Sequence, residues 1–279
     1  MRPAQVLARA ADYLERHGVE SPAPTAERLL MHVLGTDRAG ILERDGLTTR
    51  EARAFGRALC RRCTGEPVQY LTGEEGFRYL TLRVRPGVFI PRPETEVLVD
   101  VVLRRLANGS GPLVVDAGTG TGAIALSIKQ ERPDATVHAT DVSAEAVELA
   151  RENASALGLD VHVVQGDLLR PLPAELRGAV DVVVSNPPYV PPGDRDDLAA
   201  TVLAEPALAL FGTIEVYRQL FDEAAVWLRP GGAIAVEIEE RAAAGVSAAA
   251  RDAGFEDLEV TQDLNGRDRV VSGRRPRPS

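Results

Sequence analysis

From residue 93 onward, short apolar runs alternate with segments of helical pattern, and this alternation restricts the fold more than any other feature of the sequence. The expected strands are 112–118, 136–141, 161–167, 181–186 and 233–239. The expected helices between and beside them are 94–107, 122–131, 143–158, 213–228 and 241–254. Apolar strands that alternate with helices are typical of parallel sheets covered on both faces. We therefore predict a doubly wound α/β domain over residues 93–279, with two more strands, 255–263 and 268–274, at its end.

The first 65 residues carry a different pattern, made of short amphipathic helical segments. Thr48 or Thr49 can cap the last of these helices, with Glu51 in its first turn. Residues 66–92 are rich in Gly, Pro and β-type residues, and the apolar positions between Phe77 and Val84 predict a strand or hairpin. The predicted organisation is a small helical domain at 1–65, a β-hairpin linker at 66–92 and the α/β domain at 93–279.

Charge and composition exclude several classes of protein. A net charge of −9 with a pI near 5.1 argues against direct binding to the phosphate backbone of nucleic acid. No apolar run approaches the roughly 20 residues that a membrane span needs, and the N-terminal segment lacks the apolar core of an export signal, so we expect a cytoplasmic protein. Cys60 and Cys63 lie in a helical pattern, without a second Cys pair or clustered His, so we expect free thiols and no metal site.

A glycine-rich segment, VVDAGTGTGA, lies between a predicted strand and a predicted helix. Its loop consists of Gly118, Thr119, Gly120, Thr121 and Gly122. As G-x-G-x-x-A it fits a dinucleotide-binding loop, and as D-x-G-x-G-x-G it fits a loop that binds S-adenosylmethionine (SAM). The glycines alone fit both ligands. Asp116 favours SAM, because a carboxylate beside the loop repels a pyrophosphate and attracts an ammonium group.

Three consecutive predicted strands end in aspartate, at Asp116, Asp141 and Asp167. The carboxyl ends of parallel strands meet at one edge of a sheet, where open α/β folds bind ligands. There Asp141 can accept from two ribose hydroxyls, and Asp167 can accept from the adenine amino group while the backbone near Leu168 lines the ring. Each aspartate alone also suits a helix cap or turn, but together with the glycine loop they predict a nucleoside site.

The fourth predicted strand, DVVVS, delivers Asn186, Pro187, Pro188 and Tyr189 to the same edge. The prolines have no N–H and cannot continue a sheet, so their carbonyls are left to accept from another group. Asn186 adds a side-chain carbonyl, and Tyr189 adds an aromatic face. Two convergent acceptors beside an aromatic ring complement a planar –NH2 group, and they strengthen as positive charge develops on its nitrogen. The loop therefore predicts methylation of an amino or amide nitrogen.

The chain resembles the PrmC/HemK-type release factor glutamine methyltransferases. The similarity extends over EPVQYLTGEEGF, PGVFIPRPETEVLV, DAGTGTGAIALSI, VSNPPYV, EPALALFG, VYRQLF and GRDRVV. The run IPRPETE, residues 90–96, is the most specific of these, because the glycine loop and Asn-Pro-Pro-Tyr also occur in other methyltransferases. The resemblance implies a SAM-dependent methyltransferase fold preceded by a helical domain that engages a protein substrate.

The resemblance further implies that this substrate is a class I peptide chain release factor, a protein of translation termination, whose Gly-Gly-Gln loop enters the pocket. Asn186 and the Pro187 carbonyl would hold the glutamine amide, with Pro188 and Tyr189 beside it. Arg92 and Glu94 would close the pocket around the substrate. The glycine loop, Asp141 and the segment of Asp167 and Leu168 would hold SAM, with Asn186 close to it.

Two segments depart from the family pattern, and both follow strands or motifs at the same sheet edge. Only residues 213–215 separate ALALFG from VYRQLF, and residues 238–243 read IEERAA where the family tends to carry a Gly and a Gln. They leave open a related N-methyltransferase that acts on a small molecule or another protein. Adenine methylation of nucleic acid shares the Asn-Pro-Pro-Tyr chemistry, but the chain has no basic target-recognition segment.

Overall fold

The computed structural model of the chain describes residues 2–106 and 110–277, which fall into two units. The helical unit comprises Met1–Glu74 with Leu198–Ala204, and the α/β unit comprises Glu75–Asp197 with Glu205–Ser279. The residues predicted as a linker, 66–92, are divided between the two units. Residue 107, the last of the predicted helix 94–107, lies outside the described residues.

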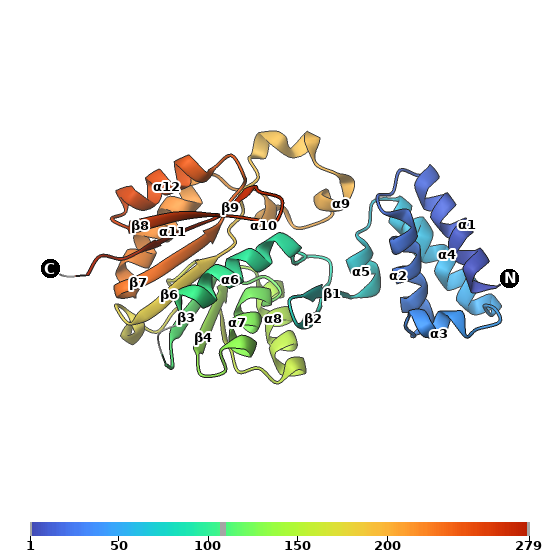
Figure 1. Ribbon diagram of the computed structural model, residues 1–279, viewed down its shortest axis with the longest axis horizontal. Coiled ribbons are helices and arrows are strands. Elements are labelled where there is room, and N and C mark those ends of the chain that lie inside the picture. Colours follow the sequence, from blue (N-terminus) through green and yellow to red (C-terminus); the bar gives the residue numbers. More distant parts are fainter. Residues whose placement is uncertain (1, 107–109, 278–279) are drawn as a thin grey trace. The chain divides into compact units, whose positions relative to one another are not determined.

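A seven-stranded sheet in the order β5-β4-β3-β6-β7-β9-β8 forms the centre of the α/β unit (Figure 1). Strands β3 to β7 pair in parallel, and β9 pairs antiparallel with both β7 and β8. The strands are β3 (Leu113–Ala117), β4 (Thr136–Asp141), β5 (His162–Gln165), β6 (Val180–Ser185), β7 (Leu228–Glu237), β8 (Glu256–Gln262) and β9 (Asp268–Arg274). This topology confirms the predicted doubly wound α/β fold.

The direction of winding changes between β3 and β6. The chain adds β4 and β5 next to one edge of β3, and then adds β6 and β7 next to its other edge. Val114 of β3 pairs with Val137 of β4 and with Val182 of β6. Open α/β sheets bind ligands at the carboxyl ends of the strands at such a switch point. The glycine loop follows β3 and the Asn-Pro-Pro-Tyr loop follows β6, so both lie at the switch point.

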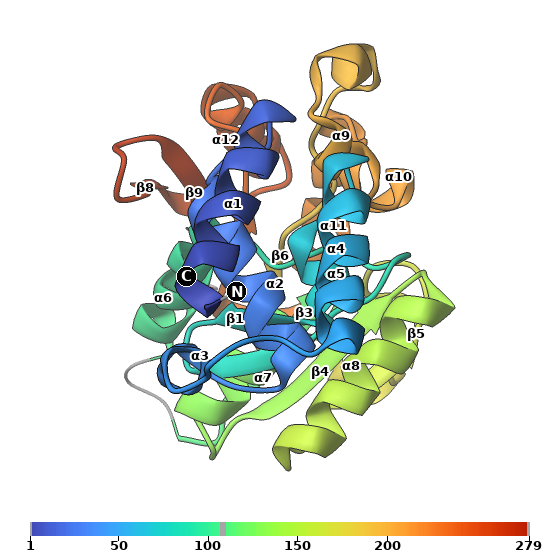
Figure 2. The same ribbon diagram turned by 90° about the vertical axis from the view of Figure 1, so that its right-hand side faces the viewer.

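Alternate residues of each strand enter two apolar layers, one on each face of the sheet. Val114 and Val182 pack in one layer, while their neighbours Val115 and Val183 pack in the other. Helices cover both faces (Figures 1 and 2). The first layer contains side chains of α6 (Glu96–Arg105), α7 (Ala123–Glu131) and α8 (Ala144–Leu157), and the second those of α11 (Ile214–Trp227) and α12 (Ala243–Asp252). Because both faces are buried, the central strands β3 and β6 are mostly apolar, whereas the edge strand β8 is polar and largely exposed.

The predicted hairpin consists of β1 (Glu74–Phe77) and β2 (Leu80–Arg83), which form a two-stranded sheet. Its turn is fixed by Arg78, which has a positive φ of 51° and whose side chain is only 10% exposed. The guanidinium binds Glu131 at 2.6 Å and Asp100 at 2.7 Å. These ion pairs and the burial of Phe77 in the first layer attach the hairpin to the α/β unit.

The helical unit contains α1 (Pro3–Arg16), α2 (Pro22–Leu34), α3 (Arg38–Leu42), α4 (Thr49–Cys63) and α5 (Val68–Thr72). In it α1, α2 and α4 run side by side around a core of their own, which includes Leu29 and Phe55 (Figures 1 and 2). Thr48 caps α4: its hydroxyl accepts from the N–H of Glu51 at 3.3 Å, and the Glu51 carboxylate accepts from the N–H of Thr48 at 2.7 Å. This capping box confirms the predicted start of the helix. Cys60 and Cys63 are free thiols.

Several short elements have no strong periodic signal and were not expected from the sequence. They are α5, the 3-10 turns η2 (Ala174–Leu176) and η3 (Pro192–Asp197), and the helices α9 (Ala200–Leu203) and α10 (Ala207–Leu210). The first two residues of the predicted helix 94–107 belong instead to the 3-10 turn η1 (Pro93–Thr95), and α6 begins at Glu96. Strand β7 begins at Leu228 rather than 233, because Leu228 pairs with Val180 before the register shifts. Within residues 2–106 and 110–277, no helix is both long enough and apolar enough to cross a membrane.

Candidate active site

The glycine loop folds over the end of β4. Gly118 donates its N–H to the carbonyl of Thr140 at 2.8 Å, and Gly118, Gly120 and Gly122 have left-handed φ values of 77°, 57° and 87°. Glycine adopts this conformation without the strain that a side chain adds. A β-carbon at Gly118 or Gly120 would meet no atom within 4 Å, whereas one at Gly122 would lie 2.9 Å from Leu126. The first two glycines therefore border open space, and the third allows close packing of α7.

Asp116 at the end of β3 is fully buried. Its Oδ2 accepts from the Thr119 hydroxyl at 2.6 Å and from the N–H of Ala125 at 3.2 Å. Its Oδ1 is buried without a hydrogen-bond partner among the described residues. Burial raises the pKa of Asp116 to about 7, although the bonds from Thr119 and Ala125 act in the opposite direction. An unpaired buried carboxylate oxygen beside the loop suits a cationic ligand group.

Asp141 at the end of β4 binds the same loop. Its Oδ2 accepts from the N–H of Gly120 at 2.8 Å, and its Oδ1 accepts from the N–H of Ser143 at 2.9 Å. Burial raises the pKa of Asp141 above its ordinary value. Each carboxylate oxygen still has a second lone pair, so Asp141 can accept from further hydroxyl groups.

Asp167 and Leu168, which follow β5, differ from the other two strand ends. The Asp167 carboxylate is half exposed and pairs with Arg170 at 2.9 Å and with Gln219 at 3.3 Å. Leu168 has a positive φ of 46°, and its carbonyl accepts from the buried hydroxyl of Thr140 at 2.7 Å. The backbone of Leu168 is thus fixed to β4, whereas the Asp167 side chain points to polar partners at the surface.

The Asn-Pro-Pro-Tyr loop presents two acceptors that the protein itself does not use. The Asn186 amide donates through Nδ2 to the Thr95 hydroxyl at 3.2 Å. No described residue donates a hydrogen bond to Asn186 Oδ1 or to the Pro187 carbonyl. Ser185, just before them, donates to the carbonyl of Ala117 at 2.7 Å and joins the ends of β6 and β3. The two free carbonyl oxygens therefore lie next to the strand that carries the glycine loop.

Glu237 at the end of β7 is a site residue that the sequence analysis missed. It is 1% exposed, its Oε1 accepts from Tyr189 Oη at 3.4 Å, and its Oε2 has no partner among the described residues. Burial raises its pKa to about 7, against the lowering effect of Thr95, Arg269 and Tyr189. Burial also raises the pKa of Tyr189, and the charge of Glu237 raises it further. Tyr189 is therefore a neutral phenol.

A partly buried ion pair joins two of the family-like motifs. Arg92 pairs with Glu205, which is 5% exposed, and the same carboxylate accepts from the N–H of Ile90 at 2.9 Å. The Arg92 guanidinium also lies 5.1 Å from the centre of the Phe89 ring. Glu94 is exposed, and its charge contributes to the raised pKa of the Glu237 carboxyl. Arg92 thus fixes the chain before η1, while Glu94 is free to meet a ligand.

Gly212 supports the Asn-Pro-Pro-Tyr loop from the other side. A β-carbon at Gly212 would lie 1.8 Å from the carbonyl oxygen of Pro188, so no other residue fits at this contact without a shift of the backbone. Val190 donates to Leu210 at 2.9 Å, and Gly212 donates to Val190 at 3.0 Å. The Pro188 carbonyl is consequently covered by Gly212. This corrects the expectation that both proline carbonyls of the loop are open acceptors.

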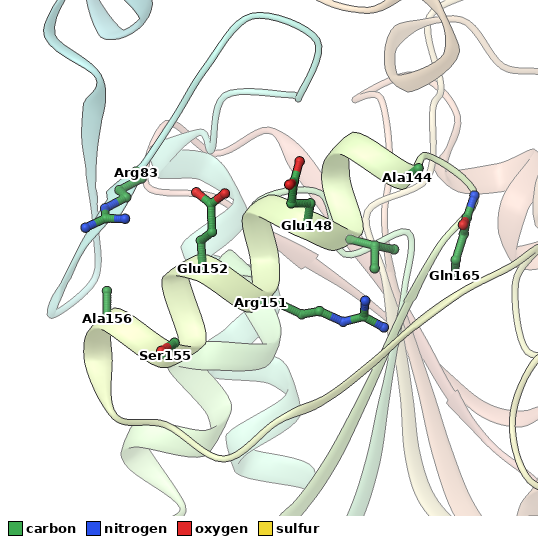
Figure 3. A pocket seen from close by; sticks show the side chains of 9 residues that line it. Arg83, Ala144, Glu148, Arg151, Glu152, Ser155, Ala156 and Gln165 are labelled. Carbon is green, nitrogen blue, oxygen red and sulfur yellow. The ribbon is translucent and has the colours of Figure 1, made fainter.

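An open groove of about 740 Å³ lies elsewhere, along α8. Figure 3 shows side chains of one flank of α8 together with Arg83 and Gln165. Two of its carboxylates, Glu148 and Glu152, already pair with Arg85 at 3.0 Å. The groove contains none of the predicted site residues. In the described part of the chain, no group of three or more His, Cys, Asp or Glu could hold a metal ion.

The sequence analysis did not identify four residues of the site, Thr95, Glu205, Gly212 and Glu237. Each of them contacts residues that are distant in the sequence. Three of them lie in segments whose family resemblance is visible, IPRPETE and EPALALFG. Glu237 had a weaker signal, namely a carboxylate at the end of an apolar strand at the ligand edge.

Two family models match the chain. A model described as "PrmC N-terminal domain" matches residues 5–73, and a model described as "Methyltransferase small domain" matches residues 79–212. A solved 16S rRNA N2 G1207 methyltransferase from T. thermophilus, in complex with AdoMet and guanosine, has a TM-score of 0.54 and 20% identity. That match covers 72% of this chain and 49% of the other, and it concerns the fold alone. The sheet, the glycine loop at its switch point and the methyltransferase family model define the chain as a methyltransferase.

Curated relatives give a narrower assignment. The release factor glutamine methyltransferase of Deinococcus radiodurans is 43% identical over 281 aligned positions, and the alignment covers 99% of this chain and 99% of the relative. That of Moorella thermoacetica is 43% identical over 274 residues, or 95% of both chains. The chain belongs to the release factor glutamine methyltransferase family. This confirms the resemblance inferred from the motifs.

Proposed function

We propose that this enzyme transfers a methyl group from SAM to the side-chain amide nitrogen of the glutamine in the Gly-Gly-Gln motif of class I peptide chain release factors. The observation that supports this best is the pair of free acceptors, Asn186 Oδ1 and the Pro187 carbonyl, at the switch point of the sheet. A primary amide has two N–H donors in one plane, and two convergent carbonyls can bind both.

The residues around the glycine loop fit SAM. The open space beside Gly118 and Gly120 admits a ligand close to the backbone. The unpaired Oδ1 of Asp116 suits the ammonium group, and Asp141 can accept from the ribose hydroxyls. The segment of Asp167 and Leu168 would border the adenine. When bound, SAM supplies a methyl group that its sulfonium makes electrophilic.

The chain's own residues would bind and orient the acceptor. Asn186 Oδ1 and the Pro187 carbonyl accept hydrogen bonds from the two amide N–H groups and hold the nitrogen toward the sulfonium. Pro188 and Tyr189 border the amide plane. As the N–C bond forms and the S–C bond breaks, positive charge grows on the nitrogen, and both acceptors bind it more strongly. The surplus N–H proton then leaves to solvent. Arg92 holds the segment before η1 in place, and Glu94 borders the incoming loop.

The relatives and the net charge of this protein both support a release factor as the methyl acceptor. Both relatives are release factor glutamine methyltransferases, and a net charge of −9 suits a protein substrate better than nucleic acid. The domain that matches the PrmC N-terminal model would engage the body of the release factor. We propose that the reaction takes place in the cytoplasm, where release factors act.

The test is methylation of a purified class I release factor with tritiated SAM, followed by mass spectrometry of the Gly-Gly-Gln peptide. We expect one added methyl group on the glutamine. Asn186→Ala should lower turnover by on the order of 100-fold and leave SAM affinity unchanged, because it removes a bond that strengthens in the transition state. Asn265→Ala, at an exposed turn, is the matched control. Label on a small molecule, another protein or DNA adenine, but not on the factor, would reject this acceptor.

A further inference from the structure

The segment that follows β5 is held by two other elements, β4 and α11. The buried hydroxyl of Thr140 in β4 donates to the carbonyl of Leu168 at 2.7 Å. The carboxylate of Glu223 in α11 accepts from the backbone N–H of Leu169 at 3.0 Å. That carbonyl and that N–H belong to one peptide group, and in a trans peptide they point in opposite directions. The peptide group is therefore clamped from both sides.

The clamp acts on a strained residue. Leu168 has a positive φ of 46°, a conformation that a bulky side chain rarely adopts and that persists only where the surroundings impose it. Backbone strain of this kind is concentrated at ligand sites. Leu168 is the residue whose backbone is proposed to border the adenine, so Glu223 and Thr140 together fix one wall of the base site.

Glu223 also holds the side chain of Asp167, through an arginine. Arg170 donates from Nε to Glu223 at 2.9 Å and pairs with Asp167 Oδ2 at 2.9 Å. Gln219, one turn earlier on α11, donates to Asp167 Oδ2 and to Glu223 Oε1, each at 3.3 Å. Both partners of Asp167 use Oδ2, and no described residue donates to Oδ1. Oδ1 is therefore left to accept from a ligand.

We propose that Glu223 is a positioning residue that makes the site selective for adenine over a 6-oxopurine. It fixes the peptide group between Leu168 and Leu169 beside the ring, and through Arg170 it fixes the carboxylate of Asp167. Oδ1 then accepts from the 6-amino group of adenine. The 6-oxygen of hypoxanthine would instead face the carboxylate, and two acceptors cannot bind each other. This inference rests on the placement of the adenine in the proposed function.

The binding test compares S-adenosylhomocysteine with S-inosylhomocysteine, which carries hypoxanthine, by isothermal titration. Wild type should bind the adenine compound about tenfold or more tightly, as expected for a hydrogen bond to a charged group. Glu223→Met keeps the length of the side chain and removes both acceptor oxygens, so it should reduce that preference to about twofold or less. Glu215→Met, the same change at an exposed position of α11, is the matched control and should keep the preference.

The ratio of the two affinities separates positioning from a general loss of stability, which would weaken both compounds alike. Asp167→Ala should abolish the preference by itself. Because Glu223 acts on selectivity through Asp167, adding Glu223→Met to Asp167→Ala should change the ratio by no more than about twofold. A preference that survives in Asp167→Ala would show that another group reads position 6 of the base, and it would overturn the inference.

A second measurement needs no ligand. Hydrogen exchange of the Leu169 amide in the ligand-free enzyme reports the clamp directly, and Glu223→Met should speed it by about tenfold or more. Unchanged exchange, or an unchanged preference for adenine in this variant, would overturn the positioning role. Neither measurement uses a methyl acceptor. If the enzyme leaves release factors unmethylated, the proposed acceptor fails, while these two measurements still decide the role of Glu223.

Discussion

At the scale of single residues, Asp116 links burial, ligand binding and pH. Burial raises its pKa to about 7, so the ligand-free fold favours the protonated acid. Its contribution to the free energy of unfolding is complete below the ordinary aspartate pKa of about 4 and is lost as the pH rises through about 7. Asp116→Asn should therefore make the ligand-free protein more stable than wild type at pH 8, by on the order of a few kcal/mol. Urea unfolding at pH 5 and pH 8 measures this difference.

The same residue gives SAM binding a pH dependence. An ammonium group beside Asp116 favours the carboxylate, so binding below pH 7 should release a proton, and affinity should rise as the pH approaches 7. Calorimetry at pH 6 in two buffers of different ionisation enthalpy measures the proton released. Asp116→Asn should abolish that release and weaken SAM binding by about tenfold or more. Equal proton release in both proteins would show that another group is responsible.

What could be predicted from sequence depended on how far apart the interacting residues lie. Asp116 and Asn186 were found because each directly follows an apolar strand, and the carboxyl ends of parallel strands share an edge. Thr95 was not found as a partner of Asn186, because the two are 91 residues apart. Ile90 and Glu205 are separated by 115 residues. Such contacts follow from tertiary packing, which no local pattern specifies.

At the scale of elements, three segments lock one another around the Asn-Pro-Pro-Tyr loop. Glu205, before α10, holds Ile90 and Arg92 ahead of η1, and Thr95 in η1 holds Asn186 after β6. Gly212, after α10, packs against the loop. The family-like runs IPRPETE and EPALALFG thus have a structural role at the site although neither contains the proposed acceptor oxygens. Short helices such as α10 were missed because about one turn is too short for an apolar period to be detected.

Gly212→Ala tests this packing. The added β-carbon would lie 1.8 Å from the Pro188 carbonyl oxygen, so the loop or the segment after α10 must move. We expect a loss of stability of about 1–3 kcal/mol and a loss of turnover on the order of tenfold or more, with SAM affinity retained. Gly245→Ala in α12 is the matched control, since a β-carbon there meets no atom within 4 Å and alanine favours helix. Wild-type turnover in Gly212→Ala would separate the loop's position from catalysis.

At the scale of the whole molecule, the two units have separate apolar cores and only one of them carries the proposed SAM site. We expect two thermal transitions, of which SAM raises only that of the α/β unit, by about 2.7 kcal/mol at a concentration of 100 Kd. Leu29→Ala and Leu98→Ala are matched changes, because both leucines are 0% exposed, one in each unit. Each should cost its own unit about 2–5 kcal/mol.

Leu29→Ala should therefore lower the transition that SAM does not move, and Leu98→Ala the one that it does. If the helical unit engages the protein substrate, Leu29→Ala should also raise the KM for a release factor while SAM affinity stays at the wild-type value. Scanning calorimetry with and without SAM, together with initial rates over a range of release factor concentrations, provides both readouts. A single transition that both variants lower equally would mean that the two units unfold together. The helical unit would then stabilise the SAM site in addition to engaging the substrate.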